Sequence, residues 1–176
     1  MTETQCFIGI DPGPTTGLAV AYWHDGWVQP AAFQCDAATA VTLLRWVLRD
    51  NGHCNGRAPA RKQVRAQVEE FRLGTGAGAR GPDAAATRSL SEDLAMTLMR
   101  EHVPCLIRPA AAVKPWATDK RLEKAGLIRV TSGMPQHARD AFRHLLFTAV
   151  HDGGVPDPLS KSAGGASVNY RVRREL

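Results

Sequence analysis

Residues 6–17 read CFIGIDPGPTTG, and this short stretch decides the fold that we expect. An apolar run ends in Asp11, a turn rich in glycine and proline follows, and residues 18–22 (LAVAY) resume the apolar pattern. The two runs can pair as antiparallel strands, because glycine lets the backbone turn where a side chain would clash. An ionised carboxylate at the end of a buried strand is costly unless a cation or hydrogen bonds compensate it. Asp11 is therefore either a residue that caps the turn or a ligand for a metal ion.

A second acidic position ends another predicted strand. Residues 64–71, VRAQVEEF, are rich in β-forming side chains and contain the adjacent acids Glu69 and Glu70. Successive residues of a strand point to opposite faces, so only one of the two can face a given site. Alternation places Glu69 on the polar face, with Arg65 and Gln67, which favours it over Glu70 as a ligand.

The third position lies at the start of a predicted helix over residues 136–149. His137 and Asp140 are three residues apart, so they lie on neighbouring parts of the helix surface. An apolar stripe with helical spacing runs along the same segment and consists of Ala138, Phe142, Leu145 and Ala149. Carboxylate oxygens together with an imidazole suit Mg²⁺ or Mn²⁺.

The order of these segments resembles the RuvC-type Holliday-junction resolvases of the RNase H-like superfamily, in a compact form typical of bacteriophages. The resemblance runs from about Gln5 to Asp152 and rests on three motifs, which are Asp-Pro-Gly at 11–13, Val-Glu-Glu-Phe at 68–71 and His-Ala-Arg-Asp-Ala at 137–141. Many bacterial members carry Asp-x-x-Asp on the late helix, whereas this chain has His-x-x-Asp.

The resemblance implies a metal-dependent active site with two Mg²⁺ or Mn²⁺ ions. The catalytic and metal-binding residues carried over from the family are Asp11, Glu69, His137 and Asp140. Two divalent ions can activate a water on one side of a phosphodiester and stabilise the leaving oxygen on the other. The implied function is an endonuclease that resolves Holliday junctions and other branched DNA by paired phosphodiester hydrolysis. Two symmetric nicks need two sites, so we expect a homodimer.

The implied architecture is an α/β, RNase H-like fold with a mixed central sheet, antiparallel first strands and helices on both faces. The order of apolar and amphipathic segments agrees with it. Beyond the segments already described, we expect an edge strand at 27–35, a helix at 39–50, a helix at 84–102, a short buried strand at 105–107 and a helix at 117–125.

The chain carries a formal net charge of +5, which favours an anionic partner such as branched DNA. Residues 109–114, PAAAVK, resemble a Pro-x-x-Val-Lys stretch that contacts DNA in the resolvases, with one additional residue. Aromatic side chains can stack on bases at a branch point, although core packing also explains an aromatic residue after a strand. The expected DNA-binding residues are Phe71, Arg72, Lys114 and Lys120.

Length and composition suit one domain. A chain of 176 residues that is 44% hydrophobic can form a substantial core. We expect the nuclease domain at 1–152 and a flexible basic C-terminal arm at 153–176, where glycine, proline and serine become frequent. Neither a signal peptide nor an apolar run of membrane-spanning length is evident. These features favour the cytoplasm, that of a bacterial host if a phage encodes the protein.

Three alternatives stay open. The glycine-rich turn also resembles the first phosphate loop of the actin-like ATPases, although these proteins need two such lobes. A structure-selective nuclease with other substrates would share the metal site. A non-catalytic DNA-binding or assembly protein could have kept the fold. The remaining histidines, including His144, are interpreted as structural.

Overall fold

The computed structural model describes residues 4–24, 27–50, 63–71, 82–125, 127 and 135–160. One five-stranded sheet, with strand order β3-β2-β1-β4-β5, forms its centre. The strands are β1 (Gln5–Asp11), β2 (Thr15–Trp23), β3 (Trp27–Asp36), β4 (Val64–Glu69) and β5 (Cys105–Arg108). The first three pair antiparallel, whereas β4 is parallel to β1 and β5 is parallel to β4. This mixed pairing confirms the expected sheet.

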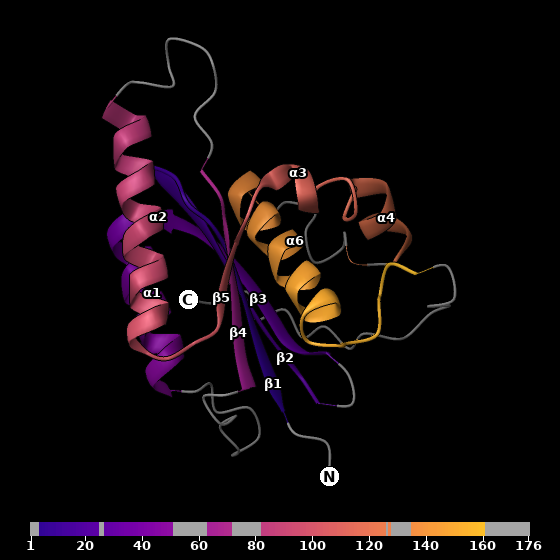
Figure 1. Ribbon diagram of the computed structural model, residues 1–176. Helices are drawn as coiled ribbons and strands as arrows, with labels where there is room; N and C mark the ends of the chain where they lie inside the picture. Colours follow the sequence, from indigo (N-terminus) through magenta and orange to yellow (C-terminus); the bar gives the residue numbers. More distant parts are fainter. Residues whose placement is uncertain are drawn as a thin grey trace.

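Helices cover both faces of the sheet, as expected (Figure 1). They are α1 (Ala37–Asp50), α2 (Pro82–Arg100), α3 (Ala110–Val113), α4 (Asp119–Lys124) and α6 (Gln136–His151). In Figure 1, α1 and α2 lie on one side of the sheet, and α6 lies on the other with α3 and α4 beside it. Across the described ranges, none of the helices combines the length and the apolar character that crossing a membrane would need.

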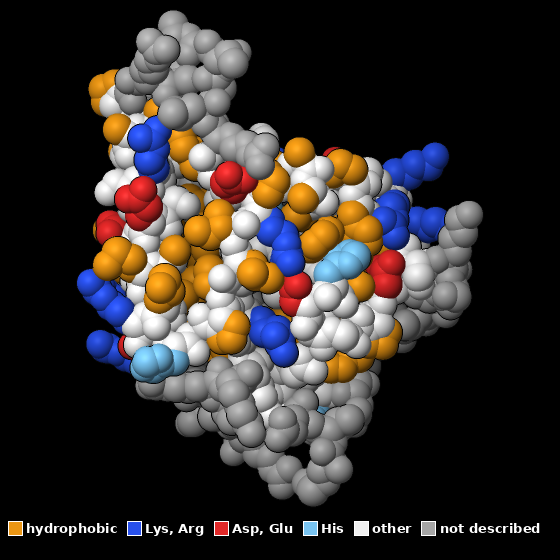
Figure 2. Space-filling view, in the orientation of Figure 1, with side chains coloured by type: hydrophobic (Ala, Val, Ile, Leu, Met, Phe, Trp, Pro, Cys, Tyr) orange, Lys and Arg blue, Asp and Glu red, His pale blue; other side chains and the backbone are white. Residues whose placement is uncertain are grey.

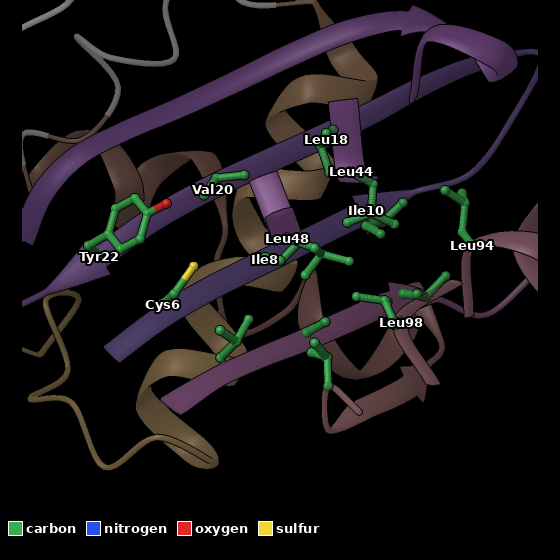
Figure 3. Close-up of a cluster of buried hydrophobic side chains, with 14 of the residues drawn as sticks. Cys6, Ile8, Ile10, Leu18, Val20, Tyr22, Leu44, Leu48, Leu94 and Leu98 are labelled. Atoms are coloured by element: carbon green, nitrogen blue, oxygen red, sulfur yellow. The ribbon is translucent and has the colours of Figure 1, made fainter. Parts of the chain in front are cut away.

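The strands separate two hydrophobic cores by simple alternation. Ile8 and Ile10 of β1 point toward α1 and α2, where they meet Leu44, Leu94 and other side chains of the first core (Figure 3). The alternate residues Phe7 and Gly9 face α6, and Phe7 joins a second core that includes residues of that helix. The period of two residues in a strand thus gives β1 two buried faces.

Two glycines allow α6 to lie directly on the sheet. A Cβ atom on Gly9 of β1 would overlap the carbonyl oxygen of Ala141, and one on Gly17 of β2 would overlap that of His137. The backbone of α6 therefore approaches β1 and β2 more closely than any side chain would permit. This contact fixes the first turn of α6 next to the end of β1.

The predicted burial of β5 is wrong. Leu106 is 43% exposed and Ile107 is 55% exposed. The reason is that β5 is an edge strand, so its apolar side chains are not covered on both faces of the sheet. Figure 2 shows hydrophobic side chains gathered over this region, and the exposed ones from α2 are Met96 and Met99. An apolar run in a sequence does not tell an edge strand from a central one.

The folded part of the chain continues past the expected boundary at residue 152. Val155 and Leu159 are both buried in the core beneath α6. Residues 153–160 thus belong to the described part of the chain, positions 161–176 lie outside the described residues, and the flexible basic arm stays a prediction.

We expect Gly9→Ala to destabilise the protein, because its methyl group would push α6 off the sheet. Overpacking a filled interior typically costs about 1–3 kcal/mol. Urea unfolding followed by circular dichroism measures this change. Gly13→Ala is the matched control and should cost less, since the nearest atom to its Cβ would be the carbonyl oxygen of Thr15 at 3.1 Å. Wild-type stability in Gly9→Ala would contradict the expected close packing.

Candidate active site

Asp11 ends β1 beside the first turn of α6 and is only 6% exposed. Its Oδ2 atom lies 2.7 Å from Nδ1 of His137. The pKa of Asp11 is raised to about 6, chiefly by burial and then by the negative charge of Glu69, with a smaller contribution from Asp140, while the hydrogen bond and charge of His137 partly offset this rise. The raised pKa therefore indicates a carboxylate that is buried near other carboxylates and whose negative charge is only partly neutralised.

His137 joins Asp11 of β1 to β3, which lies on the other side of β2 in the sheet. Its backbone N–H donates to Oε1 of Gln34 at 3.2 Å, while its ring contacts Asp11. The close approach of α6 to Gly17 occurs at the backbone of this same residue. The position of the imidazole thus depends on three strands that the sequence places far from it.

Glu69, at the end of β4, faces α6. Its Oε2 atom lies 2.8 Å from Nε2 of His144 and 4.0 Å from Nζ of Lys114. The backbone N–H of Glu70 donates to the carbonyl oxygen of Arg108 at 2.7 Å and so extends the pairing of β4 with β5. Of the two adjacent glutamates, Glu69 is the one whose charge reaches Asp11.

Asp140 is 3% exposed and contacts two cations. Nζ of Lys114 lies 3.0 Å from its Oδ2 atom, and the guanidinium of Arg143 pairs with its Oδ1 atom. Arg143 also pairs with Asp119 and donates from Nε to the carbonyl oxygen of Ala117 at 3.0 Å. A carboxylate this deeply buried is stable only with such partners.

Lys114 supplies a positive charge among the acids. Burial alone would lower its pKa, but the hydrogen bond with Asp140 and the charges of Glu69, Asp140 and Asp11 outweigh burial and raise it. The side chain is 42% exposed, so solvent and a bound ligand can reach it. Three carboxylates from β1, β4 and α6 therefore share one flexible ammonium group.

The donor set fits a hard divalent cation. Asp11, Glu69 and Asp140 offer oxygen ligands, and the raised pKa of Asp11 shows that more positive charge would be favourable there. Among the described residues, no three His, Cys, Asp or Glu side chains are already arranged around one point as ligands. Instead, Lys114 and Arg143 neutralise part of the acidic charge.

The other predicted DNA-binding residues are placed as follows. Lys120 is exposed on α4, and Phe71 is partly exposed immediately after β4. Lys114 follows α3 and lies within the acidic cluster rather than apart from it. Arg72 lies outside the described residues.

The interpretation of His144 as merely structural missed its contact with Glu69. His144 is fully buried, and its ring bridges α6 and β4. A signal was present in the sequence, because Asp140, His144, Thr148 and Asp152 follow one another at intervals of four residues. This spacing places polar side chains in one row along a helix.

Comparison with solved structures identifies the fold. RuvC from T. thermophilus in complex with a Holliday junction substrate matches with a TM-score of 0.53 and 18% sequence identity, over 86% of this chain and 96% of that one. The chain has a RuvC-like fold. A second structure of Thermus thermophilus RuvC matches with the same TM-score and 19% identity, over 85% of this chain and 96% of that one. No protein-family model matches the sequence, and no curated protein does either.

We expect Asp11→Asn to stabilise the metal-free protein near pH 7. The pKa of Asp11 is about 6 in the folded state against an ordinary 3.8, so its ionisation disfavours the folded state as the pH rises through that range. Removing this charge should raise the free energy of unfolding by about 1–3 kcal/mol near neutral pH, and the gain should vanish below about pH 4.

Urea unfolding at several pH values in the presence of a chelator measures the difference between variant and wild type. A constant difference across the whole pH range would show that Asp11 keeps an ordinary pKa in the folded protein.

Proposed function

We propose that this protein is a divalent-metal-dependent endonuclease that resolves four-way DNA junctions and other branched DNA. The observation that carries the proposal is the convergence of Asp11, Glu69 and Asp140 beside the first turn of α6, with only partial charge compensation. The RuvC-like fold adds support, because one of its matching structures holds a Holliday junction substrate.

Asp11, Glu69, His137 and Asp140 would hold the metal, which we propose to be two Mg²⁺ or Mn²⁺ ions. Bound divalent ions would activate water for attack on a phosphodiester and neutralise charge on the leaving oxygen. Carboxylates from three separate elements supply hard ligands, and the imidazole of His137 adds a nitrogen at their edge.

Each side chain of the cluster has a role that follows from its contacts. His137, hydrogen-bonded to Asp11, can take up or release a proton beside that carboxylate. Arg143 holds Asp140 from the inside of the fold, which fixes the orientation of the carboxylate. Lys114 is partly exposed, so its ammonium group can turn from Asp140 toward a phosphate of bound DNA.

We also propose that the enzyme is a homodimer, because paired nicks need two sites and each chain supplies one. The exposed apolar side chains of β5 and α2 support this proposal as a surface that a second copy could cover. Sedimentation at micromolar concentration should give the mass of a dimer. A monomer that still makes paired cuts would contradict it.

We expect Asp11→Asn and Glu69→Gln to lose cleavage of a labelled four-way junction by orders of magnitude while junction binding survives. Both substitutions keep the size of the side chain and remove the charge that a metal needs. Glu70→Gln is the matched control and should cleave nearly as wild type. Cleavage by the wild type should require Mg²⁺ or Mn²⁺ and stop in EDTA.

Full activity in EDTA would end the metal-dependent proposal. Binding of branched DNA without cleavage in either metal would favour a non-catalytic DNA-binding protein of the same fold. Loss of cleavage in Glu70→Gln with normal activity in Glu69→Gln would show that the ligand is the other glutamate.

A further inference from the structure

A continuous row of polar side chains lies beneath Glu69, between β4 and α6. We propose that Gln67 and His144 are positioning residues that fix the proton arrangement around Glu69 and thereby hold its carboxylate in one orientation. The role of Glu69 as a metal ligand rests on the proposed function, but the proton arrangement rests on hydrogen bonds of the metal-free protein alone.

The arrangement is anchored by Arg108 at the end of β5. Its guanidinium donates to both carboxylate oxygens of Asp152, at 2.7 and 2.8 Å, just beyond the end of α6. The Nη1 atom of Arg108 also lies 2.8 Å from Oε1 of Gln67. A guanidinium can only donate, so the group of Gln67 that faces it must be the carbonyl oxygen.

Thr148 fixes the same end of the Gln67 amide. Its hydroxyl group donates to Oε1 of Gln67 at 2.6 Å. With its oxygen held by two donors, the amide must present its Nε2 group to the ring of His144. Gln67 and His144 are both fully buried, so their groups must find partners within the protein rather than in bulk water.

The orientation of the amide determines where the proton of His144 sits. Nδ1 of His144 faces the Nε2 group of Gln67, which donates, so Nδ1 must be the unprotonated, accepting nitrogen. The ring proton is then on Nε2, which donates to Oε2 of Glu69 at 2.8 Å. Arg108 thus determines, through one amide and one imidazole, that Glu69 receives a hydrogen bond from within the fold.

Two periodicities bring this row together. Gln67 and Glu69 are two residues apart on β4 and share its face toward α6, while His144 and Thr148 are four apart on the helix. Outside this row, Nζ of Lys114 lies 4.0 Å from Oε2 of Glu69, and the charge of Asp11 also acts on this carboxylate. Glu69 therefore has a fixed donor on the inner side and a flexible cation on the other.

A purely structural role would not require a row of hydrogen-bonded polar side chains between β4 and α6. Apolar side chains of similar shape can replace a buried hydrogen-bonded pair at little cost in stability. Hydrogen bonds to a metal-binding carboxylate have a separate use, because they orient the ligand, and losing them commonly lowers metal affinity by about 10–100-fold. The polar row ends at a proposed ligand, which favours positioning over packing.

The first test measures the proton on His144 directly. The ¹⁵N chemical shifts of the histidine rings in the metal-free wild-type protein should show His144 with a proton on Nε2 and none on Nδ1. In Gln67→Glu, the new carboxylate can only accept, so Nδ1 should gain a proton, and Arg108 and Thr148 keep their acceptor. A proton on Nδ1 in the wild type would overturn the proposal.

The second test measures Mn²⁺ binding by calorimetry on the full chain. His144→Leu should weaken binding by about 10-fold or more. His144→Gln should recover much of the affinity, because its amide can still donate to Glu69. His151→Leu, seven residues further along the same helix and exposed, is the matched control and should bind as wild type.

The two tests separate this inference from the proposed function. Wild-type Mn²⁺ binding that is unchanged in His144→Leu would overturn the positioning role while leaving the nuclease proposal intact. A wild-type protein that shows the expected ring proton but binds no Mn²⁺ would overturn both the nuclease proposal and the positioning role, and would leave only the proton arrangement.

Discussion

The contact between α6 and the sheet is the constraint on which the site depends. Because Gly9 and Gly17 carry no side chain, the helix backbone rests on β1 and β2 without an intervening layer. This close approach brings the ring of His137 within 2.7 Å of Asp11 and places Asp140 among charges from two other elements. A bulkier residue at either glycine would therefore act on the site through the position of α6.

Charge compensation within the cluster is uneven, and the difference follows from where each acid is held. Asp140 contacts both Arg143 and Lys114, whereas Asp11 has a hydrogen bond with the imidazole of His137 and feels the negative charges of both other acids. Burial, together with these negative charges, raises the pKa of Asp11. A protein selected for stability alone would have little reason to keep such a residue buried, and functional sites commonly retain groups of this kind at a cost in stability.

The sequence predicted the antiparallel pairing of the first strands, because this pairing depends on a local pattern. The choice of Asp11, Glu69, His137 and Asp140 as metal ligands came from the family resemblance, and it stays a prediction. Alternation along residues 6–17 and 64–69 indicated the faces of β1 and β4, and helical spacing paired His137 with Asp140. The exposure of Leu106 and Ile107 was not predictable in this way, since it depends on which strand ends the sheet. The partners of Lys114 were not predictable either, because its ammonium group contacts acids from β4 and α6 that are distant in sequence.

His144 belongs to a network that joins α6 and β4. The spacing of polar residues on the helix and the spacing on the strand predict this network only when they are considered together. Polar residues recur every four positions from Asp140 on α6 to Asp152 just beyond its end, and Gln67 and Glu69 are two positions apart on β4. Their meaning appears once the α6 face is placed against β4, because the donors and acceptors then match in sequence from Arg108 to Glu69. In this row, each group must donate or accept according to the hydrogen bond that its neighbour makes. The orientation of a carboxylate at the surface-facing end is therefore determined by a guanidinium that never touches it.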